Sequence, residues 1–224
     1  MLQPAGKSKS RRNLFIVLGI IVVLIIAMIL STKFLNPQEL TAALPKKFDP
    51  KQAASDLWGK AQTEIPDNAQ PLGEVVPAMQ KDLKAAATKY KAVSPAEGAY
   101  DFPVKFDGTV TDASADSLRL SVPGVPKQTV VIIPLTTAIN GSAVRDAMGF
   151  KFGDAPGQTD YQFVADELKK LMQEQVKSGL SDPASLKGKK VSGTGVVVVL
   201  SPSGAPPPPA KPVNVQPVTI KAGS

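Results

Sequence analysis

The clearest pattern in the chain is one long apolar run near its start. From Leu14 to Leu30 the sequence reads LFIVLGIIVVLIIAMIL, without a charged residue. At about 1.5 Å per residue, a helix of this length is at the lower limit of what crosses a bilayer core, and the apolar residues that follow extend it. We therefore predict a basic tail over residues 1–13, a transmembrane anchor in contact with the lipid bilayer over residues 14–35, and a linker over residues 36–47.

The charges around this run predict its orientation. Lys7, Lys9, Arg11 and Arg12 precede it without any acid, whereas the charges after it are scattered. Basic residues favour the cytoplasmic side, so we expect a single-pass protein of the cell membrane with a cytoplasmic N-terminus and an extracytoplasmic C-terminal domain. Two alternatives remain: a cleaved signal peptide, whose apolar core is usually shorter, and a buried helix of a soluble fold.

Helical spacing of apolar residues follows in a segment that we place at residues 48–95. Asp49-Pro50 offers an N-cap and a proline in the first turn, and Pro66 is expected to end this helix. A second helix is predicted from about Val75 to Lys91. Trp58 lies on the apolar face of the first helix, so we expect it in the core rather than stacked on a ligand.

From Tyr100 the period changes to two, which is typical of β-strands. One strand is predicted from Tyr100 to Thr111, and Pro103 limits where its unpaired position can face. Turn residues at 112–116 lead to a second strand through Leu118, Leu120 and Val122. A third strand, residues 129–133, is apolar on both faces and should be central.

Two helices are expected after these strands. Ser142 can cap a short helix that ends at Gly149. Thr159 and Gln162 have capping-box spacing and open a longer helix that stops at Gly179. The predicted buried stripe of this helix is Phe163, Val164, Leu168, Leu171, Met172 and Val176.

Two further strands complete the pattern. The valine-rich stretch 190–200 contains Gly193 and Gly195, which suggest a bend or a close backbone approach. Residues 201–212 include four consecutive prolines and read as an exposed loop, and residues 213–221 return as the last strand. Three strands, a helical segment and two strands predict an α+β fold, with a five-stranded OB-like β-barrel over residues 96–224.

The composition excludes many kinds of site. The chain of 224 residues has no Cys and no His, so it cannot form a Ser/His/Asp or Cys/His nucleophile system, and it lacks the usual ligands of structural zinc, haem and iron–sulfur clusters. No loop reads as an EF-hand. We therefore expect no enzymatic activity, no cofactor and no metal. The absence of Cys also excludes disulfides and lipid attachment through an N-terminal Cys.

The net charge of +7 gives little support for a nucleic-acid partner. Four of the 26 basic residues precede the apolar run, which leaves 22 basic against 19 acidic residues in the rest of the chain. OB-type barrels bind single strands through aromatic residues in a basic groove. Because the outer domain has few aromatics and is only slightly basic, we expect no nucleic-acid binding.

The most site-like cluster comprises Asn140, Gly141, Ser142, Arg145 and Asp146. A helix N-terminus with a nearby arginine can hold a carboxylate, a phosphate or sugar hydroxyls. The simpler interpretation is an ordinary helix cap with a surface ion pair or a salt bridge into the barrel. We keep Asn140, Ser142, Arg145 and Asp146 as candidate contacts to a ligand or partner.

Three segments carry a resemblance to a known family. They are AYDFPVKFDGTVTDASADSLRLSV, INGSAVRDAMGF and FVADELKKLMQEQV, within a region from about Phe48 to Ile220. In this order they resemble a bacterial family of predicted periplasmic lipoproteins of unknown function. The resemblance implies a small barrel and, from gene neighbourhood in the family, an association with sugar-type ABC uptake systems. Family members generally carry a lipidated Cys, whereas this chain presents an apolar helix.

Three functions are compatible with these observations. The first is a membrane-anchored extracytoplasmic accessory or interaction module, with transporter subunits as its membrane protein partner. The second is direct binding of a small solute such as a carbohydrate, which a concave patch of aromatics and amides would favour. The third is an envelope hydrolase that uses carboxylates only, which two facing acids in a deep cleft would favour.

Overall fold

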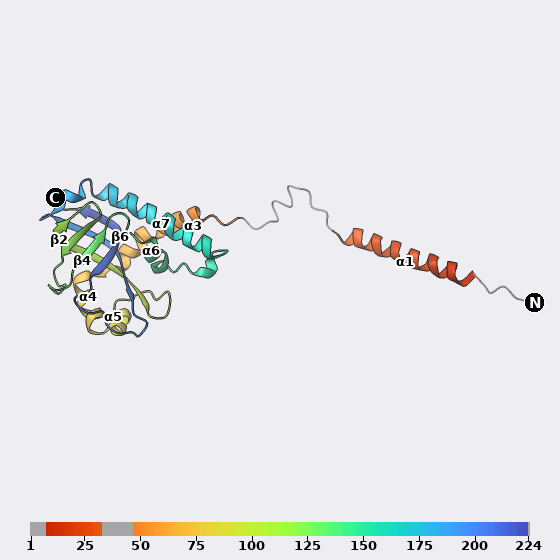
Figure 1. Ribbon diagram of the computed structural model, residues 1–224, viewed down its shortest axis with the longest axis horizontal. Helices are drawn as coiled ribbons and strands as arrows, with labels where there is room; N and C mark the ends of the chain where they lie inside the picture. The colour runs from red at the N-terminus through yellow and green to blue at the C-terminus, as the bar shows by residue number, and fades with distance from the viewer. Residues whose placement is uncertain (1–7, 33–46, 224) are drawn as a thin grey trace, which may run out of the picture. The chain divides into compact units, whose positions relative to one another are not determined.

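A computed structural model describes residues 8–32 and 47–223 and divides the chain into two units, residues 1–47 and 48–224. The described part of the first unit is helix α1, Ser8–Ser31 (Figure 1). Within the described residues, Asn13–Ser31 is long and apolar enough to cross a membrane, a criterion that a signal sequence also meets. The predicted linker lies outside the described residues except for Lys47, as does most of the basic tail.

The second unit contains helices and strands of one mixed α+β fold. Its helices are α3 (Pro50–Asn68), α4 (Leu72–Lys81), α5 (Leu83–Lys89), α6 (Gly141–Ala147) and α7 (Gln158–Gly179), with 3₁₀ turns η1 (Phe152–Asp154) and η2 (Pro183–Leu186). Its strands are β1 (Gln70–Pro71), β2 (Ala99–Ala113), β3 (Ser117–Ser121), β4 (Val131–Pro134), β5 (Lys190–Leu200) and β6 (Val213–Ala222).

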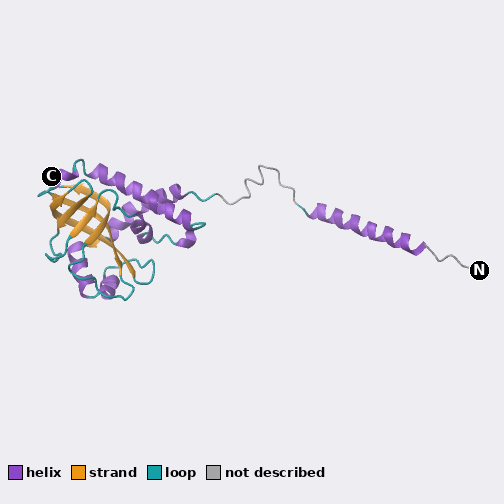
Figure 2. Cartoon of the chain, in the orientation of Figure 1, coloured by secondary structure: helices purple, strands orange, loops and turns teal. Residues whose placement is uncertain are grey.

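The strand pairings return to the strand from which they start. β2 pairs with β3 and with β5, β3 pairs with β4, β4 pairs in parallel with β6, and β6 pairs with β5. Figure 2 shows these strands as one curved sheet bordered by helices. The five predicted strands are present, and β4 has partners on both sides as expected. The described sheet has six strands because the two-residue β1 adds to β2 in parallel.

Gly193 and Gly195 of β5 lie close to the main chain of β6. A Cβ atom on Gly193 would lie 2.1 Å from the main-chain oxygen of Thr219, and one on Gly195 would lie 2.3 Å from that of Gln216. The register between β5 and β6 also shifts between Thr194 and Gly195. The prediction of a close backbone approach is confirmed, because no larger side chain fits at either position.

The helical segment differs from its prediction in two places. Pro66 lies inside the last turn of α3 rather than ending it. Proline lacks only the N–H donor, and its carbonyl still accepts from Ala69 N–H at 3.2 Å, so the helix continues to Asn68. The predicted second helix is two helices, α4 and α5. Asp82 separates them in an extended conformation, and its carboxylate accepts from Ala85 N–H at 3.0 Å as the N-cap of α5.

The caps of the later helices differ from their predictions as well. Asn140, not Ser142, caps α6, and its Oδ1 accepts from Ser142 N–H at 3.0 Å. α7 begins after Gly157 without a side-chain cap, so the predicted capping box at Thr159 and Gln162 is wrong. Gly149 closes α6 at φ +73°, which confirms its predicted C-terminal position.

The core lies between the sheet and its helices. α3, α6 and α7 gather at one side of the sheet, whereas α4 and α5 lie at another (Figure 1). Trp58 is buried in this core, as expected. The buried stripe of α7 comprises Val164, Ala165, Leu168, Met172 and Val176. Phe163 was predicted in that stripe, but its side chain is 51% exposed. Ala165 is buried instead, because Gly141 of α6 packs closely against this part of α7.

Candidate functional site

Arg145 and Asp146 form a bonded cluster with Tyr161 at the contact between α6 and α7. Arg145 Nε donates to Asp146 Oδ1 at 2.8 Å, and Arg145 Nη1 donates to the main-chain oxygen of Tyr161 at 3.2 Å. The Tyr161 hydroxyl donates to the same Asp146 oxygen at 3.2 Å. The Arg145 side chain is almost fully buried, so its charge is compensated within the protein rather than by water.

An open cavity of about 370 Å³ lies beside this cluster. Its walls are residues 93–95, residues 149–153, and the side chains of Asp146 and Tyr161. We call it the aromatic pocket, because Phe150 and Phe152 also line it. Asp146 therefore contributes both to the buried cluster and to an accessible wall.

The rings of the aromatic pocket are fixed against one another. Phe150 stacks on Tyr161 with ring centres 6.0 Å apart, and Phe152 meets Tyr161 edge-on with ring centres 5.7 Å apart. Phe152 nevertheless remains 56% exposed. Burying a phenylalanine favours folding, so a ring left this exposed offers apolar area for a contact outside the domain.

Asp101, near the start of β2, is a buried acid close to this pocket. It is 1% exposed, and its Oδ2 is the only buried side-chain oxygen or nitrogen of the described residues without a hydrogen-bond partner. Its main chain exchanges two hydrogen bonds with Val93, which lines the aromatic pocket. Burial, and secondarily the charge of Asp146, raise the pKa of Asp101 to about 7.

Tyr161 remains a hydrogen-bond donor in this environment. Burial raises the pKa of its hydroxyl, and the negative charge of Asp146 raises it further, while Arg145 acts in the opposite direction. The phenol is therefore protonated at neutral pH and donates to Asp146.

The structure brings together only part of the predicted cluster. Arg145 and Asp146 lie at the aromatic pocket, whereas Asn140 and Ser142 lie at the other end of α6. Asn140 caps α6, and its N–H donates to Gln216 Oε1 at 2.8 Å. Gly141 packs against α7, where a Cβ atom would lie 1.9 Å from the main-chain oxygen of Ala165. The role of the four candidate residues in binding stays a prediction.

Sequence reasoning missed the residues that complete this site. Phe150 and Phe152 flank Lys151 just after the predicted short helix, and this pair of aromatics in a loop was a usable signal. Tyr161 lies at the start of α7, and its position in the sequence does not indicate that its hydroxyl bonds to Asp146 of α6. Asp101 could be placed only as a polar position of an alternating strand.

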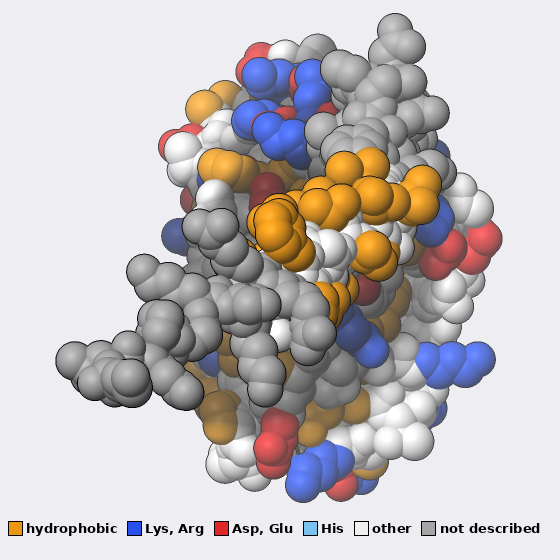
Figure 3. All heavy atoms as spheres, turned by 90° about the vertical axis from the view of Figure 1, so that its right-hand side faces the viewer, with side chains coloured by type: hydrophobic (Ala, Val, Ile, Leu, Met, Phe, Trp, Pro, Cys, Tyr) orange, Lys and Arg blue, Asp and Glu red, His pale blue; other side chains and the backbone are white. Residues whose placement is uncertain are grey.

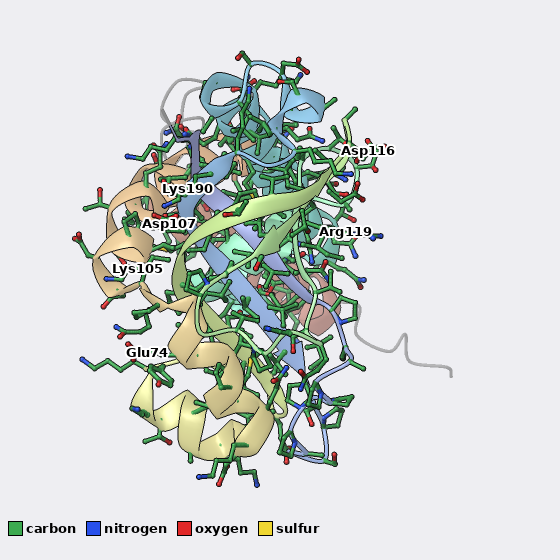
Figure 4. All side chains as sticks on the ribbon, turned by 90° about the vertical axis from the view of Figure 1, so that its left-hand side faces the viewer. Glu74, Lys105, Asp107, Asp116, Arg119 and Lys190 are labelled. Atoms are coloured by element: carbon green, nitrogen blue, oxygen red, sulfur yellow. The ribbon has the colours of Figure 1, made fainter. Side chains whose placement is uncertain are left out.

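A second, more open cavity of about 630 Å³ lies between the start of α4, the middle of β2 and the loop after β3. Lys105, Asp107, Lys190 and Glu74 line it, and Figure 4 shows them along one side of the domain, with Arg119 on the opposite side of the view. Its apolar lining includes Leu72, Phe106 and Val122. Charges of both signs line this cavity, so their sum selects neither an anion nor a cation.

On the face seen in Figure 3, Lys and Arg side chains stand among Asp and Glu side chains. Residues 8–32 and 47–223 contain no group of three or more Asp or Glu side chains that could hold a metal ion.

Comparisons with known proteins bear on the fold and the family. The chain is similar to an OB-fold protein from Thermotoga maritima of known crystal structure, with 22% identity, a TM-score of 0.65, and coverage of 80% of this chain and 100% of the other. At this identity the likeness shows the fold alone. No curated protein matches the chain significantly. The model of the family described as predicted periplasmic lipoprotein (DUF2291) matches residues 21–221, and the chain therefore belongs to this family, whose function is unknown.

Proposed function

We propose that the protein is a membrane-anchored, extracytoplasmic binding module without enzymatic activity, whose aromatic pocket holds a small polar solute of the carbohydrate class. The observation that carries this proposal is the position of Phe152. Its ring is 56% exposed and lines a cavity that also contains Asp146 and Tyr161. An apolar ring beside fixed polar groups is the usual composition of a small-molecule site.

The chemistry of the pocket suits a sugar. An exposed ring can stack on the C–H face of a pyranose, and a carboxylate can accept hydrogen bonds from its hydroxyls. Both hydrogen bonds that Asp146 receives from Arg145 and Tyr161 go to Oδ1, so Oδ2 remains as an acceptor for a ligand. A volume of about 370 Å³ is large enough for a monosaccharide.

The two acids at this site do not support the hydrolase alternative. Carboxylate-based glycoside hydrolysis needs one acid to protonate the leaving group and another to act on the opposite side of the sugar. Asp101 has the raised pKa of a general acid, but it is 1% exposed and cannot reach a substrate in the pocket. A binding role therefore accounts for the geometry better than catalysis.

The membrane topology is part of the proposal. We infer that α1 spans the bilayer with the basic N-terminus in the cytoplasm, which the apolar run and the preceding Lys and Arg residues support. The chain has no Cys that could carry a lipid, so the apolar helix would keep the domain at the membrane in place of a lipid anchor. The domain would use its ring of paired strands as an OB-like barrel on which the pocket is built.

We also propose that the protein associates with a sugar-type ABC uptake system. It rests on the resemblance to the family and on a pocket with the chemistry of a sugar site. A domain held at the membrane could then present a solute to transporter subunits.

Binding is tested on the full chain in lipid nanodiscs. Saturation-transfer NMR and calorimetry would measure the binding of glucose, galactose, ribose and maltose to the wild type and to F152A. We expect millimolar or tighter binding of at least one sugar and a loss of about tenfold or more in F152A, since stacking of one ring contributes on the order of 1.5 kcal/mol.

The matched control is F163A, which removes a phenylalanine of similar exposure outside the pocket. This variant should bind as the wild type does. Failure of all four sugars to bind, or an equal loss in both variants, would overturn the proposal for this pocket.

Transporter association needs a separate measurement. Crosslinking in native membranes, followed by purification of the full chain and mass spectrometry, should recover subunits of a sugar-type ABC transporter. Recovery of no such subunit would refute this association without affecting the binding proposal.

A further inference from the structure

The carboxyl of Asp101 is a buried acid without a counter-charge. Its neighbours in β2, Phe102 and Val104, belong to the core, so its side chain is on the opposite face of the strand. There it is 1% exposed, and its Oδ2 has no hydrogen-bond partner among the described residues. Buried charges in proteins are normally paired, so a buried acid that lacks a partner in the free protein is a candidate to gain one when a ligand binds.

The charged groups around Asp101 do not provide that partner. On α6, Arg145 and Asp146 offset each other through a bond of 2.8 Å. On α7, Tyr161 is a neutral donor that is already bonded to Asp146. Lys151 lines the pocket but is exposed, and none of the three ion pairs of the described residues includes it. The segment 93–95 carries no charge.

Asp101 lies next to the wall of the aromatic pocket. Val93, which lines the pocket, is hydrogen-bonded through its main chain to Asp101 at 2.8 and 2.9 Å. Asp146 lines the same pocket, and its charge is close enough to act on Asp101. A cation bound at Asp146 would consequently also act on Asp101, through a medium that screens charges poorly.

We propose that the solute of the aromatic pocket carries a primary ammonium group, which Asp146 Oδ2 binds directly and which Asp101 stabilises from behind the pocket wall as it ionises. This inference rests on the proposed sugar-binding function and specifies an amino sugar. The exposed ring of Phe152 would add a favourable contact to the same ligand, either with its sugar ring or with its ammonium group.

A bound ammonium group should change the protonation of Asp101. Without ligand, burial keeps Asp101 largely protonated below neutral pH and about half protonated at pH 7. An ammonium group nearby favours the ionised carboxylate, so binding releases a proton to solvent and becomes tighter as pH rises. A neutral sugar supplies no such charge and should release no proton.

The test compares matched ligands on the full chain in nanodiscs. Glucose and galactose are each compared with their 6-amino-6-deoxy derivatives by calorimetry at pH 6 and pH 8. We expect the amines to bind about tenfold more tightly than the parent sugars at pH 8 and about threefold at pH 6, which corresponds to roughly 1.4 and 0.7 kcal/mol. Titration at pH 7 in buffers of different ionisation enthalpy should show release of a fraction of a proton with the amines only.

Two variants assign the effect to Asp101. D101N replaces the acid with an uncharged group of the same shape, and it should bind the amines with no change between pH 6 and pH 8. D107N removes an exposed acid of the other cavity and should behave as the wild type. If D101N does not fold, proton release by the wild type with the amines only still tests the ammonium proposal.

The outcomes separate this inference from the proposed function. Equal binding of amines and parent sugars, or amine binding without proton release, would overturn the ammonium proposal and leave the sugar site in place. Binding of neither the amines nor any sugar of the larger panel would overturn both. A pH dependence that persists in D101N would exclude Asp101 as its source.

Discussion

The guanidinium carbon of Arg145 lies 3.6 Å from the centre of the Tyr161 ring, and Nη1 of the same arginine donates to the tyrosine main chain. This contact joins α6 to the first turns of α7. Because Asp146 accepts from both side chains, the three residues act as one bonded unit. We expect substitutions within it to have effects that do not add.

Loss of Arg145 should destabilise the domain. R145A would leave Asp146 partly buried without its counter-charge and remove the contact to Tyr161, at a cost of about 3 kcal/mol in the free energy of unfolding. Urea unfolding of the full chain in mild detergent can be followed by the fluorescence of Trp58, the single and buried tryptophan. R119A is the control, because its ion pair with Asp112 is exposed and 3.9 Å long, and it should change stability by less than about 0.5 kcal/mol. Equal losses in the two variants would contradict this account.

Asp101 should make the domain less stable as pH rises. Its folded pKa, about 7, is above the ordinary value of 3.8, so between these values the folded state holds a proton that the unfolded state has lost. The stabilisation is present below the unfolded pKa and is lost as pH rises through the folded pKa. Between pH 5 and pH 8 the free energy of unfolding should fall by roughly 2–3 kcal/mol more in the wild type than in D101N. Parallel pH profiles for the two proteins would refute this prediction.

Gly141 should tolerate no side chain. In G141A the new Cβ would lie 1.9 Å from the main-chain oxygen of Ala165, so α6 and α7 would have to separate. We expect a loss of about 2 kcal/mol or more and weaker ligand binding, since the pocket depends on this contact. G59A is the matched control within α3, where a Cβ meets nothing within 4 Å, and it should stabilise the domain by about 0.5–1 kcal/mol. A stable G141A variant would show that the helices can adjust.

The absence of Cys makes the topology directly measurable. The variants S10C and S203C each carry one thiol, before the apolar run and in the exposed β5–β6 loop, respectively. In spheroplasts, an impermeant maleimide should label S203C, whereas S10C should be labelled only after lysis. Labelling in the opposite order would refute the proposed orientation. Loss of an N-terminal tag from the mature protein would instead indicate a cleaved signal peptide.

Local patterns were sufficient for most of the strands. Alternation in residues 100–111 and the valine-rich stretch 190–200 report directly which faces are buried, because successive side chains of a strand point to opposite sides. Helix ends were less predictable. Asp82 interrupts the second predicted helix and Asn140 replaces Ser142 as a cap, since several neighbouring polar residues can cap a helix and packing selects among them.

The sequence by itself determined the chemical limits of this protein, its apolar helix and the order of its strands. Those properties depend on residue types and on periodicity along the chain, which local physics translates into burial. Only the tertiary structure decided that Asp146 and Tyr161 share a pocket with Phe152, and that Asp101 lies buried beside it without a partner. The reason is that burial of an acid and the meeting of three distant segments arise from the packing of helices against the sheet, which no local pattern specifies.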